Sequence, residues 1–192
     1  MNNLTAGVDE AGRGPLAGPV VAAAVILNPD LPLIPDLKDS KLLSANKREK
    51  IFAQINQQAL AVSWASCSVE EIDNINILQA SLLAMRKAIL NLIIMPNYIL
   101  IDGNILPDVT GLNAKAKAIV GGDRLEPAIS AASIIAKVIR DRLMIELDQK
   151  YPHYGFAKHK GYGTKEHIMA LHKYGKIPEH RNSFLKKIYN HS

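Results

Sequence analysis

The chain has 192 residues, 48% of them hydrophobic, with one cysteine and a formal net charge of +5. This length suffices for one domain, or one and a half, with a proper core, and a single cysteine excludes an intramolecular disulfide framework. No run of about 18 apolar residues and no signal-peptide pattern is present, so we expect a cytoplasmic protein that makes no membrane contact.

The charge is spread unevenly along the chain. Residues 151–192 hold eight lysines and arginines against two glutamates, a net +6, which leaves −1 for residues 1–150. All six histidines also lie in the basic segment. This asymmetry is typical of a protein that grips a polyanion with one end and holds metal with the other, and a solvated basic surface is the alternative.

The first apolar segment ends at an acid pair, Asp9 and Glu10, followed by a turn in which glycines flank Arg13. Adjacent carboxylates repel each other, so they need a cation or a raised pKa. The N–H groups of a glycine-rich turn can face an anion. The stretch therefore predicts a divalent metal and phosphate chemistry, with an ordinary surface turn as the alternative.

The same turn formally matches a dinucleotide-binding fingerprint through Gly12, Gly14 and Ala17. That fingerprint needs a helix that opens at the glycines, whereas residues 19–27 are apolar and partly β-branched and predict a second strand. The preceding acid pair would also repel a pyrophosphate. We therefore do not favour a dinucleotide site.

Loop, helix and strand signals come next along the chain. Proline-rich residues 28–36 predict a loop, and Ser44 predicts the N-cap of a helix that carries Ile51, Ile55 and Ala59 on its apolar side. Alternating residues 61–69 predict a third strand, on which Cys67 is a buried small hydrophobe.

The next elements end at glycine and acid. Apolar residues at helical spacing predict a helix from Leu78 to Leu92, which Pro96 closes. A short buried strand at residues 98–101 leads to Asp102. A second apolar run, residues 116–120, stops at Gly121, Gly122 and Asp123.

The last third of the chain is predicted to be mainly helical. Residues 127–150 predict a long helix, residues 153–163 a loop, and residues 164–174 and 182–190 two shorter helices. The order of elements predicts an α/β fold in which helices flank a sheet. We expect residues 1–150 to form the catalytic domain and residues 151–192 a small basic helical appendage that packs on it and contributes to substrate binding.

Four carboxylates share one setting, because each lies beside glycine at the end of a predicted strand. They are Asp9, Glu10, Asp102 and Asp123. Carboxylate oxygens suit Mg²⁺ or Mn²⁺, and no Cys/His pair has the spacing of a zinc motif. The last two acids, taken singly, would also serve as helix caps.

Five stretches of the sequence resemble motifs of bacterial ribonuclease HII, in the order of that family and over nearly the whole chain. They are GVDEAGRGPLAG at residues 7–18, DSK at 39–41, LIDGN at 100–104, ISAASIIAK at 129–137 and HKGY at 159–162. The resemblance implies an RNase H-like mixed sheet flanked by helices. It also implies metal-dependent endonucleolysis of RNA in RNA-DNA hybrids and of single ribonucleotides embedded in duplex DNA.

The resemblance also assigns roles to residues. The metal-binding carboxylates of the family match Asp9, Glu10, Asp102 and Asp123. The turn that reads the ribonucleotide through its 2′-OH matches Gly12, Arg13 and Gly14, and the aromatic that packs on the next sugar matches Tyr162. Motifs associated with backbone phosphates contain Lys41, Ser133, Lys137 and His159.

Two features of the chain qualify the resemblance. The family usually has lysine where this chain has Gly121, so any electrostatic help from that side chain is missing. The N-terminal substrate-binding domain of type III relatives has no room before Thr5, so we expect the type II enzyme. Within the expected long helix, Asp141 is predicted to be an exposed charge near Arg140 and Arg142.

We expect a monomer that acts with two divalent ions, Mn²⁺ or Mg²⁺, one activating the attacking water and one stabilising the leaving 3′ oxygen. The products would be 3′-hydroxyl and 5′-phosphate ends, and the role would be ribonucleotide removal during DNA replication and repair. For Tyr162 the alternative is a hydrophobic plug between loop and core. The rival functions are a DNA nuclease or strand transferase, and a hybrid-binding protein without activity.

Overall fold

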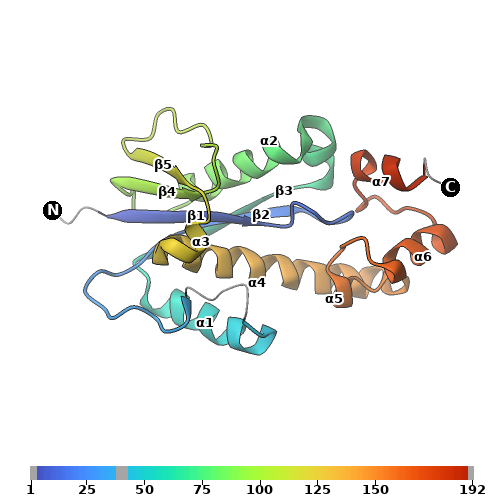
Figure 1. The fold of residues 1–192 in the computed structure, drawn as a ribbon, viewed down its shortest axis with the longest axis horizontal. Coiled ribbons are helices and arrows are strands. Elements are labelled where there is room, and N and C mark those ends of the chain that lie inside the picture. The colour runs from blue at the N-terminus through green and yellow to red at the C-terminus, as the bar shows by residue number, and fades with distance from the viewer. Residues whose placement is uncertain (1–3, 38–42, 190–192) are drawn as a thin grey trace.

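The computed structural model describes residues 4–37 and 43–189, in which a five-stranded mixed sheet has helices on both faces (Figure 1). The strand order is β3-β2-β1-β4-β5. Neighbouring strands run antiparallel from β3 to β1 and parallel from β1 to β5. The strands are β1 (Thr5–Ala11), β2 (Val20–Ile26), β3 (Ala61–Cys67), β4 (Tyr98–Asp102) and β5 (Lys115–Ile119). This arrangement confirms the predicted α/β class with a mixed sheet flanked by helices.

The helices sort into two covering layers and a C-terminal group (Figure 1). Helix α2 covers one face of the sheet, whereas α4 covers the other, with α1 beyond it; α5 and α6 gather near the far end of α4, and α7 lies on the α2 side. The helices are α1 (Ala45–Gln58), α2 (Val69–Leu90), α3 (Gly122–Leu125), α4 (Pro127–Lys150), the 3-10 turn η2 (Pro152–Tyr154), α5 (Phe156–His159), α6 (Lys165–Tyr174) and α7 (Asn182–Tyr189). Among the described residues, no helix has the length and hydrophobicity needed to cross a lipid bilayer.

Each face of the sheet has its own core. The alternation of side chains along β2 sends Ala24 and Ile26 toward the α2 side and Val25 toward α4 and α1, and all three are fully buried. Strand β2 is therefore apolar throughout, as expected for a strand covered on both faces. Cys67 is buried on β3, as predicted.

Helix α2 begins nine residues before the predicted start at Leu78, so that boundary was wrong. Ser68 and Glu71 form a capping box, in which each side chain hydrogen-bonds the other residue's main-chain N–H. Asn76 then breaks the helix with a φ of 66°, and its side chain accepts hydrogen bonds from Leu78 N and Gln79 N. The apolar periodicity restarts after this kink, which explains why the sequence pattern missed the first turns.

The predicted loop at residues 153–163 also contains structure, because η2 and α5 lie within it. Tyr154 and Phe156 are buried and stack at a ring distance of 5.5 Å. They form a third apolar cluster with Ala17, Met144 and Ala170, which joins the C-terminal segment to the end of α4.

Strand β1 crosses α4 at very close range, and Gly7 is the reason. A Cβ atom at Gly7 would lie 2.0 Å from the main-chain carbon of Ala128 and 2.2 Å from the nitrogen of Ile129. Backbone atoms cannot rotate aside as a side chain does, so only glycine fits here. This contact fixes the distance between α4 and the strand that carries the first acids.

We therefore expect Gly7→Ala to destabilise the protein by about 3 kcal/mol or more, because overpacking against backbone must displace a helix. Thermal denaturation would show this as a fall of about 6 °C or more in Tm. The matched control is Gly14→Ala, whose Cβ would meet only the Tyr162 ring at 3.4 Å. Its Tm should stay within about 2 °C of the wild type, and equal losses in both variants would contradict the role given to Gly7.

Candidate active site

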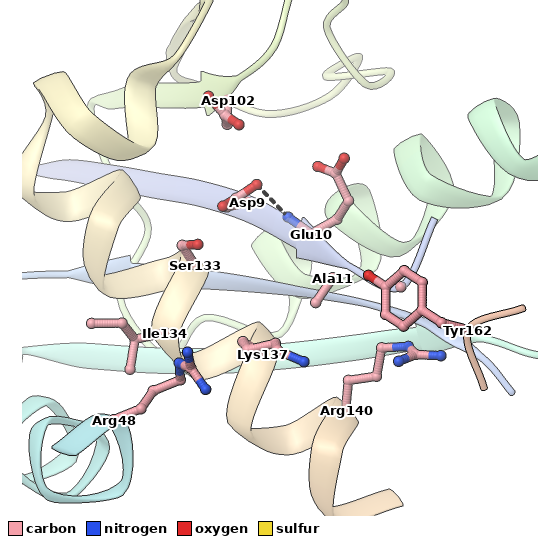
Figure 2. Close-up of a pocket in the computed structure, with 11 residues that line it drawn as sticks. Asp9, Glu10, Ala11, Arg48, Asp102, Ser133, Ile134, Lys137, Arg140 and Tyr162 are labelled. Atoms are coloured by element: carbon pink, nitrogen blue, oxygen red, sulfur yellow. Dashed lines mark hydrogen bonds between the residues drawn. The ribbon is translucent and has the colours of Figure 1, made fainter. Parts of the chain in front are cut away.

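A cleft of about 360 Å³ opens where β1 and β4 end beside α4 (Figure 2). Acids from the two strands and cations from α1 and α4 face it together, as Figure 2 shows. The cleft is lined by Asp9, Glu10, Ala11, Gly12, Arg48, Asp102, Ser133, Ile134, Lys137, Arg140 and Tyr162. Its polar lining and its several charges are typical of a site for an ionic substrate rather than of an apolar ligand pocket.

Three of the four predicted carboxylates meet in this cleft. Asp9 and Glu10 lie near the end of β1, and Asp102 is the last residue of β4. The two strands are parallel, with Val8 opposite Ile101, so their next residues reach the same edge of the sheet. This register explains how acids that are over 90 residues apart in the sequence come together.

Asp123 does not line the cleft. It lies in the first turn of α3 with 1% of its surface exposed, and Ser130 Oγ donates a 2.6 Å hydrogen bond to its main-chain oxygen. A Cβ at the preceding Gly122 would be 3.4 Å from Asp102 Oδ1, so the start of α3 packs directly on Asp102. The fourth acid is therefore buried, and the residue before it in the sequence packs on Asp102.

Gly121 occupies the N-cap of α3 with a φ of 69°, in the left-handed region that favours glycine. A Cβ there would have no atom within 4 Å. Glycine therefore suits the local backbone here, and the position faces open space.

Burial raises the pKa of Asp9 well above its usual value, and the charges of Glu10 and Asp102 raise it further. Hydrogen bonds from Ser133 and from the Glu10 N–H, at 2.7 Å, act in the opposite direction. Burial also raises the pKa of Glu10, against the influence of Arg13, whose Nη1 lies 3.3 Å from Glu10 Oε1. The fold thus holds a set of acids that lacks sufficient positive charge to balance it.

The acid set fits a divalent cation. In the described part of the chain, the buried Asp102 Oδ1 has no hydrogen-bond partner. No group of three or more His, Cys, Asp or Glu side chains within that same part is arranged to hold an ion by itself. Mg²⁺ usually binds through one or two carboxylates and completes its shell with water and substrate phosphate, which suits an open cleft of this kind.

Helix α4 contributes Ser133 and Lys137, which are one turn apart and both line the cleft. Both residues belong to motifs that the sequence analysis associated with backbone phosphates. Lys137 Nζ lies 2.6 Å from Asp141 Oδ1. The prediction that Asp141 is an exposed charge was wrong, because its side chain is only 21% exposed in this ion pair. The pair spans one helical turn and holds the lysine beside the cleft.

The Gly12-Arg13-Gly14 turn and Tyr162 lie together at one end of the cleft. Tyr162 is 47% exposed, and a Cβ at Gly14 would lie 3.4 Å from its ring. An exposed ring that covers a glycine leaves little support for the plug alternative. The dinucleotide alternative is also excluded, since the turn leads into the antiparallel strand β2 and not into a helix.

Sequence reasoning missed two arginines that hold this turn. Arg140 and Arg181 are almost fully buried, and both donate hydrogen bonds to main-chain oxygens. Arg140 reaches Ala17 O at 3.2 Å, Pro19 O at 3.1 Å and Lys160 O at 3.0 Å. Arg181 reaches Gly12 O at 2.7 Å, Arg13 O at 3.1 Å and Gly18 O at 2.8 Å.

No signal in the sequence separates these arginines from the exposed basic residues around them, because their carbonyl partners are remote in the chain. Arg48 of α1, which also lines the cleft, was missed as well, because its position beside the acids depends on the packing of α1 near α4. Its Nη2 donates a 2.9 Å hydrogen bond to Leu43 O, which directs the side chain back along its own helix.

The predicted phosphate contact His159 does not line the cleft. His159 is 8% exposed, its Nε2 lies 2.8 Å from Tyr154 O, and its Nδ1 accepts a hydrogen bond from Gly161 N. A phosphate contact by His159 would have to break one of these bonds. Lys41 and its motif at residues 39–41 lie outside the described residues.

Comparison with known proteins gives one consistent family. The sequence model described as ribonuclease HII matches residues 6–190. The ribonuclease HII of Albidiferax ferrireducens is 60% identical over 181 residues, which cover 94% of this chain and 86% of that relative.

Two solved structures share the fold. The ribonuclease H2 of Pyrococcus horikoshii OT3 superposes with a TM-score of 0.77 at 29% identity, over 94% of this chain and 93% of that one. Bst-RNase HIII in complex with Mn²⁺ superposes with a TM-score of 0.70 over 94% of this chain and 67% of that one. At 16% identity, the second comparison supports the fold alone.

The raised pKa of Asp9 predicts a pH-dependent gain in stability for Asp9→Asn without metal. Above the raised pKa, the wild type keeps a buried charge that the unfolded chain keeps in water, so the wild type is the less stable protein. We expect the variant to melt about 3 °C or more higher at pH 8 in EDTA. The difference should shrink as pH falls through the raised pKa and vanish near the ordinary value of 3.8.

Exposed Asp30 supplies the control, because Asp30→Asn should leave Tm unchanged at every pH. Added Mg²⁺ should raise the Tm of the wild type more than that of Asp9→Asn, since the ion binds the folded acid set. A wild type that melts at or above the temperature of Asp9→Asn in EDTA at pH 8 would contradict the electrostatic description of the cleft.

Proposed function

The chain belongs to the ribonuclease HII family of type II ribonuclease H hydrolases, and we propose that it nicks duplex DNA on the 5′ side of embedded ribonucleotides as well as cutting the RNA strand of RNA-DNA hybrids. One observation carries the proposal. Three acids that fit a divalent cation share a cleft with a glycine-rich turn and an exposed tyrosine ring. Chemistry at a phosphate and selection of a sugar are thereby combined in one place.

Only the 2′-OH distinguishes a ribonucleotide from a deoxyribonucleotide, so recognition requires polar groups very close to the sugar. The turn at Gly12, Arg13 and Gly14 offers main chain without bulky side chains at its two glycines. The ring of Tyr162 lies against Gly14 and offers a flat apolar surface to the sugar of the next nucleotide. We infer that the turn reads the 2′-OH while Tyr162 places the adjoining sugar.

The cations of the cleft act on the nucleic-acid backbone in this proposal. Arg48 and Lys137 face the cleft, and exposed Lys165, Lys173 and Lys176 extend the positive charge over the C-terminal segment. Contacts of this kind bind phosphates and do not read bases, so sequence preference should be slight and affinity should fall steeply with salt.

Asp9, Glu10 and Asp102, with Asp123 beside them, would hold Mg²⁺ or Mn²⁺ together with the phosphate to be cut. The bound ions would lower the pKa of a water molecule and stabilise negative charge on the phosphate and the leaving oxygen. Hydrolysis at this position leaves 3′-hydroxyl and 5′-phosphate ends, which suits ribonucleotide removal during replication and repair by a monomeric enzyme.

The test is cleavage of a labelled duplex that contains one ribonucleotide, beside an all-DNA duplex, with Mg²⁺, Mn²⁺ or EDTA. We expect one metal-dependent cut 5′ to the ribonucleotide and none in the all-DNA duplex. Asp102→Asn should reduce turnover about 1,000-fold, or about 4 kcal/mol, and leave duplex binding nearly unchanged, because the acid acts on the phosphate undergoing reaction. Asp30→Asn should remain fully active.

Other outcomes would select the rival functions. Equal cutting of both duplexes would identify a DNA nuclease, and binding without cutting at any metal concentration would identify a hybrid-binding protein. Turnover by Asp102→Asn at the wild-type rate would refute the assignment of that acid.

Tyr162 gives a second test that separates sugar placement from core packing. Tyr162→Ala should reduce kcat/KM about tenfold or more, because a misplaced substrate reacts slowly even when the catalytic groups are intact. Its Tm should change by less than about 2 °C, since the ring is half exposed. Tyr162→Phe keeps the ring and should retain most activity, and a large fall in Tm with unchanged activity would instead identify a packing role.

A further inference from the structure

Three histidines of the C-terminal segment form a buried group next to Tyr162. His159, His167 and His180 are 8%, 0% and 1% exposed, respectively. The rings of His159 and His167 stack at 4.6 Å, and those of His167 and His180 lie 5.2 Å apart. None of them lines the cleft, so the proposed chemistry leaves their arrangement unexplained.

His180 and His167 form a chain of hydrogen bonds that ends at the main-chain oxygen of Tyr162, and the partners of each ring fix its tautomer. The main-chain N–H of Ile177 donates to His180 Nδ1 at 3.0 Å, so the neutral ring of His180 carries its proton on Nε2. His180 Nε2 lies 3.0 Å from His167 Nε2, and His167 Nδ1 lies 2.9 Å from Tyr162 O. A carbonyl oxygen can only accept, so His167 donates through Nδ1 and accepts from His180 through Nε2.

Both rings are held in their neutral form. Burial lowers the pKa of His180 to about 4, assisted by His167, and burial also lowers the pKa of His167. The rings of Phe156 and His159 pack on His167, and those of Tyr154 and Phe156 pack on His180. The titratable groups that act on the two histidines are His159 on His167 and His167 on His180. The hydrogen-bonded chain therefore keeps one polarity at neutral pH.

We propose that His180 and His167 are positioning residues, which fix the main chain at Tyr162 through this hydrogen-bonded chain and so hold its ring in the cleft beside the glycine-rich turn. The inference rests on the proposed contact between Tyr162 and the sugar. The same segment is already joined to the turn, since Leu16 N donates to Gly161 O at 2.8 Å and Arg181 N donates to Leu16 O at 2.8 Å. The two histidines add hydrogen bonds that connect this part of the C-terminal segment to Tyr162.

The hydrogen bonds of His167 and His180 also explain why these two positions are histidines and not apolar residues. Tyr162 O accepts hydrogen bonds from Thr164 N, at 2.8 Å, and from His167 Nδ1, at 2.9 Å, so replacing His167 by leucine would remove one of its two donors and the link to His180. A ring with one donor and one acceptor on opposite sides passes the same polarity from Ile177 N to Tyr162 O.

Two substitutions at His167 test the proposal. The amide nitrogen of asparagine can take the place of Nδ1, so His167→Asn keeps the donor to Tyr162 O and loses the acceptor for His180. The amide of glutamine takes the place of Nε2, so His167→Gln loses the donor to Tyr162 O. We expect kcat/KM on the single-ribonucleotide duplex to fall about 10- to 100-fold in His167→Gln and clearly less in His167→Asn.

A double-mutant cycle separates positioning from general loss of structure. If His167 acts by positioning the Tyr162 ring, His167→Gln should cause no further loss of kcat/KM in a Tyr162→Ala background. The activities are measured well below the Tm of each protein. Equal kcat/KM values for the two His167 variants, or additive losses in the cycle, would overturn the inference. If His167→Gln does not fold, His180→Asn, which keeps an acceptor for Ile177 N and lacks the donor to His167, replaces it in the same cycle.

The design distinguishes failure of this inference from failure of the proposed function. Full activity of Tyr162→Ala would refute the sugar contact and, with it, the role of the histidines. Loss of activity in Tyr162→Ala combined with equal behaviour of both His167 variants would refute the positioning role alone.

Discussion

The cleft depends on two buried guanidinium groups that donate hydrogen bonds to main-chain oxygens. Arg140 and Arg181 satisfy their donors with main-chain oxygens of the Gly12 to Pro19 stretch and of Lys160. Burial lowers the pKa of Arg181 to about 9, which still leaves it protonated at neutral pH. Because each guanidinium reaches several carbonyl groups at fixed angles, the turn cannot move without breaking a set of charge-assisted bonds. The two arginines thereby connect the end of β1, α4 and the C-terminal segment, and together these elements hold the glycine-rich turn in place.

The turn separates this buried positive charge from the buried negative charge of the acids. Arg13 lies between the two groups and pairs with Glu10 across 3.3 Å. The acids therefore remain a place of high negative potential that favours cations, whereas carbonyl oxygens of the turn accept from the buried arginines. Close packing of α4 on β1 at Gly7 makes this costly arrangement rigid.

Sequence patterns predicted the features that local chemistry and regular geometry determine. Acids at the ends of apolar segments predicted the cleft, because the parallel strands β1 and β4 end at one edge of the sheet. The helices that start at Ser44 and Pro127 were found from their caps and periodicity. The burial of Arg140 and Arg181 and the histidine group depend on contacts between remote segments, and no local pattern encodes such contacts. The ion pair of Asp141 with Lys137 is a local i,i+4 contact that the spacing of the two residues could have indicated. The start of α2 was missed because Asn76 interrupts its periodicity.

The basic C-terminal segment consequently has an outer and an inner role that its net charge does not distinguish. Lys165, Lys173 and Lys176 are exposed and contribute a long-range attraction for a polyanion, which salt screens. Arg181 and the buried histidines point inward and act over hydrogen-bond distances, which salt affects little. Affinity for nucleic acid and selection of the sugar should therefore respond to different residues of the same short segment. A single charged helix would be enough for affinity to nucleic acid. Selection of the sugar also requires a segment that packs against the Gly12-Arg13-Gly14 turn.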